Sequence, residues 1–316
     1  MMSLINTIFA IVAVFYLVLV VKRDLQMLQQ NSYRNERYKK WLKQNSEYTS
    51  MSRVVCMIMG LLLVSTFAPY KWFLVMKITF IVALISMSMN LLKAKYKHSL
   101  VFTKRVWRLF SAELVLMAIV ALIYSRFEMR AIAFAAIAFS AFSYAITMFT
   151  NWMLKPVEEA INKSFINDAK RILSQMPDMK IVGITGSYGK TSTKHYLERI
   201  LSEHYSVLMT PGSYNTPMGV TRTVREMLKP YNEVFIVEMG AKNVGDIKEI
   251  CDIVHPDIAL INSVGAQHLE TFKTVDNVFK TKFELADAVK AKDGNVFVNG
   301  DSKEIISRVT EGVIVY

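Results

Sequence analysis

A glycine-rich segment near the middle of the chain has the composition of a phosphate-binding loop. A β-branched run at 180–185 leads into Gly186, Gly189, Lys190 and Thr191, and a helical pattern follows. Glycines let backbone N–H groups surround phosphate oxygens, and the start of a helix adds its dipole. Lys190 would neutralise the β- and γ-phosphates of a nucleotide, and the Thr191 hydroxyl would ligate Mg²⁺. The order strand, loop, helix therefore favours a nucleotide site over a chance glycine-rich turn.

The loop departs from the strict consensus in one place. A glycine is expected five residues before Gly189, and Ile184 stands there instead. The segment is therefore a variant with the pattern Thr-Gly-Ser-x-Gly-Lys-Thr. Its expected nucleotide-binding residues are Thr185, Gly186, Ser187, Gly189, Lys190, Thr191 and Ser192.

A carboxylate follows a second apolar run. Residues 234–237 are hydrophobic, and Glu238 comes directly after them. Mg²⁺ prefers one or two carboxylates together with phosphate oxygens and waters. A carboxylate at a strand end beside a phosphate loop is therefore a candidate Mg²⁺ ligand, and a solvated Glu is the alternative.

These residues need a scaffold that brings strand ends together. From about residue 179, short β-branched runs alternate with helical patterns. The expected strands are 180–185, 206–210, 234–239, 258–263, 295–298 and 313–316, and the expected helices are 190–205, 217–228, 244–254, 275–291 and 302–308. Such alternation predicts an α/β fold with a mostly parallel sheet. Ligands of such sheets bind at the carboxyl ends of the strands.

The first half of the chain is of a different kind. Five apolar stretches approach the roughly 20 residues that a membrane-spanning helix needs: 4–21, 54–68, 72–92, 109–124 and 131–150. Hydrophobic residues make up 53% of the whole chain, which is high for a soluble protein. We therefore expect a multi-pass α-helical membrane region over 1–150. Two alternatives stay open: 54–92 could be one re-entrant hairpin, or the region could be a buried soluble bundle.

The charge of the chain is distributed unevenly. The net charge is +12, and residues 1–150 hold 18 Lys and Arg against 5 Asp and Glu, while residues 151–316 hold 20 against 21. The basic residues of the first half gather at 22–53 and 93–108. Because cytoplasmic loops are rich in Lys and Arg, five crossings would place the chain from residue 151 onward in the cytoplasm. The lipid bilayer then explains the basic composition without a nucleic-acid partner.

The segment 151–177 is expected to connect the two halves. Its apolar residues recur at helical spacing, which predicts an amphipathic helix: Ala160, Ile161, Phe165, Ile166, Ala169 and Ile172. Cys56 and Cys251 are the two cysteines of the chain, so a disulfide framework is not expected.

Several motifs, in this order, resemble those of the Mur ligases. The pattern at 185–192 is similar to the ATP-binding signature of that family, whose members form amide bonds in peptidoglycan synthesis at the expense of ATP. The stretch 213–220, Ser-Tyr-Asn-Thr-Pro-Met-Gly-Val, resembles that of the ligase type adding D-alanyl-D-alanine. Residues 265–272 are similar to the family motif Ala-His-Leu-Glu-x-Phe. The resemblance covers 178–316 and identifies this part as a central ATP-binding domain of the family.

The resemblance implies a metal site and catalytic groups. Glu238 and His268 would hold Mg²⁺ together with Thr191. The catalytic residues would be Lys190, His268 and Lys282. Lys282 matches a lysine that is often carbamylated in the family, which would turn it into an anionic metal ligand; an unmodified solvated lysine is the alternative.

The resemblance also implies residues around the two substrates. Asn215 and Thr216 would line the substrate cleft, although Asn-Thr-Pro is also an ordinary start of a helix. Asn299 matches the Asn-x-Asp turn that lies near the nucleotide in the family, and such triplets are common turns as well.

Two departures from the family pattern affect the expected function. Membrane helices stand where the family has a domain that grips a UDP-sugar, and the sequence ends before the family's C-terminal domain, so we expect a fragment or a separate partner that supplies that domain. The expected function is a membrane-anchored ligase that uses ATP and Mg²⁺. It would join a carboxylate-bearing cell-wall precursor to an amino acid or dipeptide through an acyl phosphate. A polyglutamate-synthase-like ligase and a non-catalytic ATP-binding scaffold are the alternatives.

Overall fold

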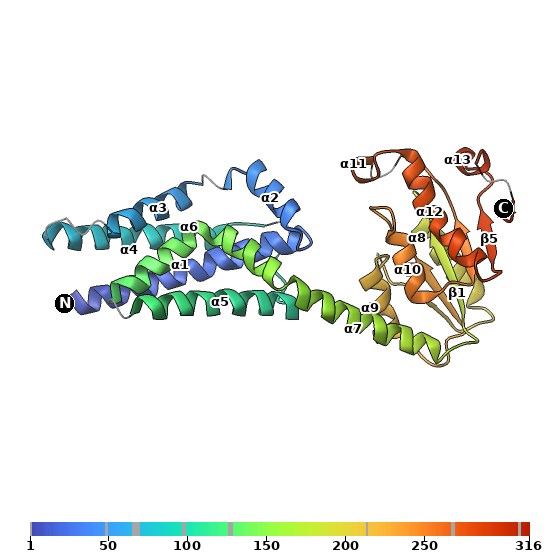
Figure 1. Ribbon diagram of the computed structural model, residues 1–316, viewed down its shortest axis with the longest axis horizontal. Coiled ribbons are helices and arrows are strands. Elements are labelled where there is room, and N and C mark those ends of the chain that lie inside the picture. Colours follow the sequence, from blue (N-terminus) through green and yellow to red (C-terminus); the bar gives the residue numbers. More distant parts are fainter. Residues whose placement is uncertain are drawn as a thin grey trace. The chain divides into compact units, whose positions relative to one another are not determined.

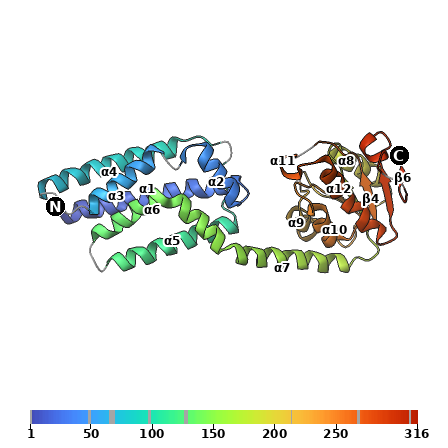
Figure 2. The same cartoon turned by 45° about the horizontal axis from the view of Figure 1, so that its top comes forward.

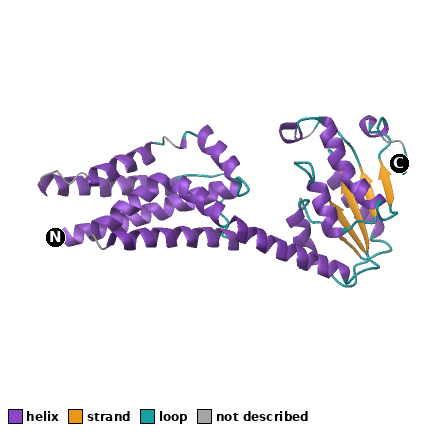
Figure 3. Cartoon of the chain, in the orientation of Figure 1, coloured by secondary structure: helices purple, strands orange, loops and turns teal. Residues whose placement is uncertain are grey.

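The structure is a computed structural model that describes residues 2–47, 50–64, 70–96, 99–125, 129–212, 214–266, 269–308 and 311–316. Contacts divide the chain into an N-terminal unit, Met1–Glu158, and a C-terminal unit, Glu159–Tyr316. The N-terminal unit is helical where it is described, and the strands lie in the C-terminal unit (Figure 3). The division falls inside helix α7, Lys155–Ser174.

The N-terminal unit is built around a pair of long helices. Its elements are α1 (Met2–Gln30), α2 (Asn35–Gln44), α3 (Met51–Val64), α4 (Tyr70–Lys93), α5 (Lys104–Ser125) and α6 (Met129–Met153). Helices α1 and α6 lie side by side in both Figures 1 and 2. Ala13, Ala136 and Ala141 are among the buried residues of their shared core. Small side chains of this kind let two helix backbones approach closely.

Large apolar side chains also cover the outside of this unit. Val82 on α4 and Val115 and Leu122 on α5 are each more than half exposed. Soluble monomers rarely expose large contiguous apolar surface, whereas a lipid environment accepts it. Helices α4 and α5 are therefore apolar on more than one face, which is typical of helices with apolar surroundings.

Two helices are long and apolar enough to cross a membrane, as judged over the described residues by length and composition. They are Leu4–Gln30 and Leu74–Lys93, and a third candidate is the pair Ala135–Met153 and Lys155–Ser174, which is bent by 46°. The expected spans 54–68 and 109–124 fall on α3 and α5, and residues 65–69 lie outside the described part. The five-span count of the sequence analysis stays a prediction.

The C-terminal unit contains a six-stranded parallel sheet. The strands are β1 (Lys180–Thr185), β2 (Val207–Met209), β3 (Val234–Glu238), β4 (Ile258–Ile261), β5 (Asn295–Val298) and β6 (Ile314–Val315). Their order is β2-β3-β1-β4-β5-β6, and each neighbouring pair is parallel. The predicted parallel α/β sheet is confirmed. Because β1 lies between β3 and β4, the loops that follow these three strands meet at one edge.

Helices cover both faces of the sheet. The helices are α8 (Lys190–Leu201), α9 (Pro217–Met227), α10 (Asp246–Val254), α11 (Leu269–Phe272), α12 (Val275–Lys290) and α13 (Lys303–Ile306). Leu197 and Leu201 of α8 pack on one face, against Val182 and Ile184. Helices α7, α9, α10 and α12 share the larger core on the other face. The alternation of side chains along each strand supplies both cores, as the near-continuous apolar runs require.

Candidate nucleotide and metal site

The glycine-rich loop connects β1 to α8 at the carboxyl edge of the sheet. Ile184 is fully buried and pairs in register with Glu238 of β3, so the strand continues through the position where the strict consensus has glycine. Gly189 precedes α8 with a φ of +80°, a left-handed conformation that favours glycine. The loop therefore turns at Gly189 and presents the first turn of α8 to the edge of the sheet.

There is little room for a side chain at Gly186. A Cβ atom there would lie 3.0 Å from Asn262 Cβ and 3.1 Å from the carbonyl oxygen of Tyr188. Ser187 is tied to the loop after β4, because its backbone N–H donates to the Ser263 carbonyl at 2.8 Å. The glycine-rich loop is therefore held by the end of β4 as well as by its own helix.

Lys190 lies within its own loop. Its Nζ donates to the Gly186 carbonyl at 2.6 Å. Burial lowers the pKa of Lys190 from its usual value, and the nearby Glu238 opposes this shift. An ammonium group in this position points into the curve of residues 186–190, where a phosphate would displace the carbonyl contact.

Glu238 is the centre of a buried polar cluster. The carboxylate is 2% exposed, and Lys194 Nζ and Thr191 Oγ1 each lie 3.0 Å from its Oε2 atom. Asn215 Nδ2 donates to Oε1 at 3.1 Å. Burial alone would raise the pKa of Glu238, but the bonds from Lys194, Asn215 and Thr191 together lower it below its usual value. The carboxylate is therefore held ionised beside the phosphate loop.

Lys194 was missed in the sequence analysis. It is fully buried, and its Nζ also donates to the Gly212 carbonyl at 2.9 Å. The signal was present: Lys194, Leu197 and Leu201 recur at helical spacing, so a lysine stands within the buried stripe of α8. A buried lysine is rarely found without a partner, and here that partner is Glu238.

The cluster around Glu238 offers oxygen ligands for Mg²⁺. The Thr191 hydroxyl and the Glu238 carboxylate are 3.0 Å apart, and both are oxygen ligands of the kind that Mg²⁺ prefers. Lys194 is a competing cation on the same oxygen atom. No group of three or more His, Cys, Asp and Glu side chains converges within the described ranges. The residues thus fit an ion that takes most of its ligands from phosphate and water.

Lys282 of α12 is buried near the phosphate loop. It is 3% exposed, and its pKa falls to about 7 because of burial and, second, the nearby charge of Lys190. Its ammonium group has no hydrogen-bond or ion-pair partner among the residues that the structure describes. Lys282 and Lys190 therefore approach the same region from different helices. His268, the third expected catalytic residue, lies outside the described residues.

Asn215 and Thr216 have structural contacts at the start of α9. The Asn215 carbonyl accepts from Gly240 N at 2.8 Å, and a Cβ atom on Gly240 would lie 2.8 Å from Asn215 Cγ. Thr216 is the N-cap of α9 and accepts from Gly219 N at 3.2 Å. The structure thus brings the Asn215 side chain to Glu238 and uses the Thr216 side chain for the helix start.

Asn299 follows β5 at the same edge of the sheet. Its backbone N–H donates to the Ile261 carbonyl at 3.2 Å, and its side-chain Oδ1 accepts from Asp301 N at 2.9 Å. The side chain therefore closes the predicted turn. Within the described contacts, Asn299 joins β4 and its own turn rather than residues 186–192.

Asn262 links three parts of the site that the sequence analysis did not connect. Its Nδ2 donates to Thr193 Oγ1 at 2.7 Å, and its Oδ1 accepts from the Tyr316 hydroxyl at 3.4 Å. Asn262 Nδ2 also lies 3.3 Å from where a Cβ atom on Gly189 would be. Asn262 could have been found from the sequence, because it is a polar residue directly after an apolar run, as Glu238 is.

Comparison with known proteins identifies the domain that carries this site. Residues 184–315 match the Mur ligase middle domain. The UDP-N-acetylmuramoyl-tripeptide–D-alanyl-D-alanine ligase of Bacillus subtilis is 32% identical over 134 residues, which are 42% of this chain and 28% of the relative. The ligase of the same name from Escherichia coli is 32% identical over 133 residues, 42% of this chain and 29% of the relative. The chain thus spans less than a third of these relatives' length.

Solved structures of similar proteins include two ligases. MurF from Acinetobacter baumannii has 26% identity and a TM-score of 0.45, with 49% of this chain and 34% of that chain covered. MurF ligase from Thermotoga maritima in complex with ADP has 31% identity and the same TM-score of 0.45, with coverages of 49% and 35%. By sequence, residues 184–315 of this chain are a Mur ligase middle domain.

Proposed function

We propose that this chain is a membrane-anchored, ATP-dependent amide ligase of the Mur type that acts in peptidoglycan or related envelope synthesis. The observation that carries the proposal is the cluster of Lys190, Thr191 and Glu238 at the edge of a Mur ligase middle domain. The relatives that match this domain are named as ligases of a muramoyl tripeptide and D-alanyl-D-alanine. The substrate pair proposed here is accordingly a carboxylate-bearing cell-wall precursor and an amino acid or dipeptide.

The proposed reaction has two steps. A substrate carboxylate oxygen attacks the γ-phosphorus of ATP, the bond to the β,γ-bridging oxygen breaks, and an acyl phosphate and ADP form. The amine nitrogen then attacks the acyl carbon, the carbon–oxygen bond to phosphate breaks, and the amine loses a proton. Lys190 and the amides of the loop stabilise the charge on the transferred phosphoryl group.

The chain's own residues would position this reaction. Thr191 and Glu238 would hold Mg²⁺, which neutralises phosphate charge when it is bound. Asn215 and Lys194 orient the Glu238 carboxylate through their bonds to its two oxygens. Displacement of Lys194 from Oε2 would free that oxygen for the ion.

Lys282 supports the proposed role of a modified lysine. With a pKa of about 7, the Lys282 amine is uncharged in a large fraction of the protein molecules near neutral pH. The neutral amine is the form that adds CO₂, giving a carbamate and a released proton. The carbamate of Lys282, with His268, would then contribute to a second metal site, as the resemblance to the family implies.

The N-terminal unit would anchor the enzyme in the cell membrane as a multi-pass bundle. Helices α1 and α4, with the bent pair α6 and α7, support this part of the proposal. The basic residues around 22–53 and 93–108 favour a cytoplasmic position for these segments and for the C-terminal unit, where ATP is present. A domain that presents the amine, as part of a longer chain or as a separate partner, would complete the enzyme.

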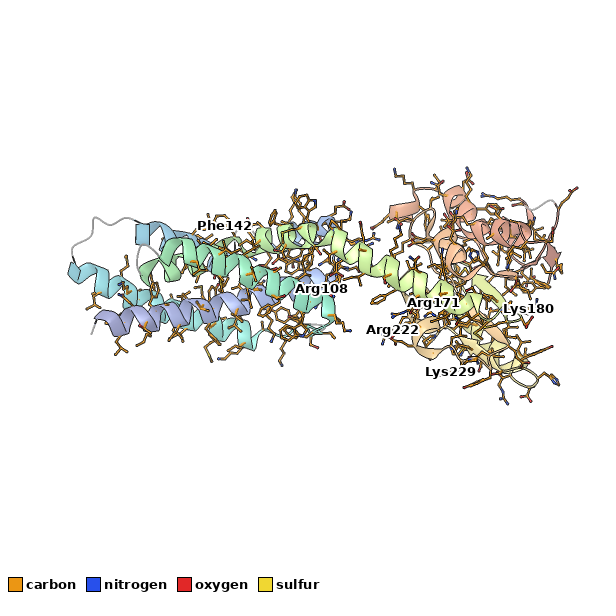
Figure 4. The ribbon with its side chains drawn as sticks, turned by 60° about the horizontal axis from the view of Figure 1, so that its bottom comes forward. Arg108, Phe142, Arg171, Lys180, Arg222 and Lys229 are labelled. Atoms are coloured by element: carbon orange, nitrogen blue, oxygen red, sulfur yellow. The ribbon has the colours of Figure 1, made fainter. Side chains whose placement is uncertain are left out.

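Nucleotide binding gives the most direct test. The full chain in detergent is titrated with a fluorescent ATP analogue and Mg²⁺, and Lys190→Ala is expected to weaken binding by at least tenfold because it removes the phosphate cation. Lys180→Ala is the matched control, since Lys180 lies at the opposite, amino end of β1 (Figure 4). Equal binding by both variants would disprove the site.

Turnover separates the ligase from a non-catalytic scaffold. ADP release is measured with candidate acyl substrates and amines, with and without a supplied C-terminal ligase domain. Release that requires both substrates and Lys190 supports the ligase. ATP binding without substrate-dependent release under any of these conditions would favour the scaffold.

A further inference from the structure

A pocket in the N-terminal unit is formed by α1, the end of α4 and described residues within 94–96 and 99–102 that follow α4. Its volume is about 340 Å³, within the range of roughly 300–1,000 Å³ that is usual for small-molecule sites. The lining is partly apolar and partly polar, with Leu19 and Lys22 on α1, Leu92 on α4, and Tyr96, Ser99 and Leu100 after it. A ligand for this pocket would therefore be amphipathic.

The polar lining residues of the α1 wall and of the wall formed by α4 and the residues after it lie at the same end of the pocket. Lys77, in the first third of α4, donates to Asn6 near the start of α1, whereas Leu92 at the end of α4 shares the pocket with Lys22. Helices α1 and α4 therefore run in the same direction. On α1 the apolar lining residue Leu19 precedes Lys22, and after Leu92 near the end of α4 the polar Tyr96 and Ser99 follow in the chain.

Val101 is held against the end of α1. The Gln29 side-chain amide donates to the Val101 carbonyl at 2.8 Å and accepts from Val101 N at 3.0 Å. This paired bond holds the backbone of residue 101 against the end of α1. The pocket wall around Leu100 is thus formed before any ligand arrives, which lowers the ordering cost of binding.

Among the described residues that line the pocket, Lys22 is the cation available to a ligand. It is exposed and has no hydrogen-bond or ion-pair partner among the residues that the structure describes. The neighbouring Arg23 is paired with Glu47 and contributes little net charge. An ammonium group beside the hydroxyls of Tyr96 and Ser99 offers a positive charge and hydrogen-bond donors, which is the chemistry that recognises a phosphate group.

Aromatic side chains next to the pocket indicate a lipid rather than a soluble anion. Phe102 lines the pocket, and its ring lies 5.0 Å from the Trp107 ring, which lies 6.1 Å from that of Phe110. Phe102 and Trp107 are 44% and 55% exposed. Exposed aromatic rings of membrane proteins concentrate at the level of the lipid headgroups. A basic pocket between helices at this level binds lipid headgroups in other membrane proteins.

We propose that this pocket binds the phosphate group of a membrane lipid. Lys22 contacts the phosphate, Tyr96 and Ser99 donate to it, and Leu19, Leu92 and Leu100 surround the first part of the lipid chain. The inference rests on the proposed membrane anchoring but is independent of the ligase reaction. Two sources share this chemistry: an anionic phospholipid and a polyprenyl phosphate.

The test measures binding of fluorescent phosphatidylglycerol to the full chain in detergent. Lys22→Gln is expected to weaken binding about fivefold, the effect of losing one cation near a lipid phosphate. Lys40→Gln is the matched control, because Lys40 is an exposed lysine of α2 that does not line the pocket. Leu100→Trp fills the pocket without changing charge and is also expected to weaken binding. Unchanged binding in Lys22→Gln and Leu100→Trp, or an equal loss in Lys40→Gln, would overturn the proposal.

Competition distinguishes the sources of the phosphate. Unlabelled phosphatidylglycerol or a polyprenyl phosphate should displace the probe, and the stronger competitor identifies the lipid. Displacement by inorganic phosphate as effective as that by either lipid would overturn the assignment to a lipid. Membrane anchoring is scored separately by alkaline extraction of membranes, so its failure is distinguishable from a failure of the pocket.

Discussion

The two units of this protein both bury charged side chains, but they arrange them differently. In the N-terminal unit, Arg53 of α3 donates to Asp24 of α1 at 3.1 Å and to Ser143 of α6 at 3.0 Å, and the ion pair is nearly fully buried. In the C-terminal unit, Glu238 and Lys194 form an equally buried pair. The first pair joins three helices. The second stands at a sheet edge beside a glycine-rich loop.

The surroundings of the two pairs explain the difference. The C-terminal pair is bonded to Thr191, in the first turn of α8, and to Asn215, in the loop before α9; α8 and that loop each follow a parallel strand. Parallel strands deliver their loops to one edge, so polar groups far apart in sequence converge there. In the N-terminal unit, Arg53, Asp24 and Ser143 instead connect the sides of three helices. A buried ion pair alone therefore does not indicate a functional site.

The largest expected effect comes from removing one partner of each pair. Lys194→Met and Arg53→Met should each destabilise their own unit by about 3–5 kcal/mol, because a buried carboxylate is left uncompensated. Hydrogen exchange of the β1 and β3 amides measures the stability of the C-terminal unit in Lys194→Met. Exchange of the α1 and α6 amides measures the stability of the N-terminal unit in Arg53→Met. The comparison fails if one variant destabilises both units equally.

Double substitutions separate the structural role of each ion pair from a role in nucleotide binding. Asp24→Leu with Arg53→Met should recover most of the stability lost in the single variant, because apolar groups of similar volume often replace a buried pair without loss. Glu238→Leu with Lys194→Met should also regain stability, yet ATP binding should be lost. Retained Mg²⁺-dependent ATP binding in the second double variant would contradict a functional role for its pair.

A smaller effect is expected at the contact between β1 and α12. A Cβ atom on Gly183 would lie 2.6 Å from Leu285 Cδ1, so Gly183→Ala should cost about 1–3 kcal/mol through overpacking. Gly183→Ala combined with Leu285→Ala should be less destabilised than the sum of the single variants. If the losses of stability in the two single variants simply added, a clash between residue 183 and Leu285 would not be the cause of the destabilisation.

The pH dependence of stability tests the burial of Lys282. Its pKa in the folded protein, about 7, is below that of an exposed lysine, 10.5, so the unfolded chain binds more protons between these values. Stability of the C-terminal unit should therefore rise with pH through this window, by at most about 1.4 kcal/mol per pH unit. Lys282→Met should lose this contribution. The same slope in both proteins would contradict a buried, unpaired ammonium.

The smallest effect concerns Thr216, for which a substrate role was expected. Its hydroxyl caps α9, and Thr216→Ala should cost about 1 kcal/mol while Thr216→Ser retains the cap. Exchange rates of the first α9 amides measure the change. A stability loss in Thr216→Ser as large as in Thr216→Ala would exclude capping as the reason for the hydroxyl.

Local sequence patterns predicted some of the residues at the carboxyl edge of the sheet and missed others. Lys190, Thr191 and Glu238 were identified because each follows a strand in a recognisable pattern, and the structure brings them together. Lys194 and Asn262 were missed because their roles depend on partners 44 and 69 residues away, namely Glu238 and Thr193. A pattern within one helix or loop carries no information about which distant residue completes its hydrogen bonds.

Sequence alone determined the parallel α/β unit, its glycine-rich loop and the apolar helices of the first half, because periodicity and glycine placement act over a few residues. Tertiary structure decided that Lys194 neutralises Glu238, that Lys282 approaches Lys190, and that Gln29 holds Val101 over a pocket. These pairings depend on strand order and helix packing, which are set by the whole core rather than by any local segment. The charge state and accessibility of each group then depend on its burial in the assembled fold.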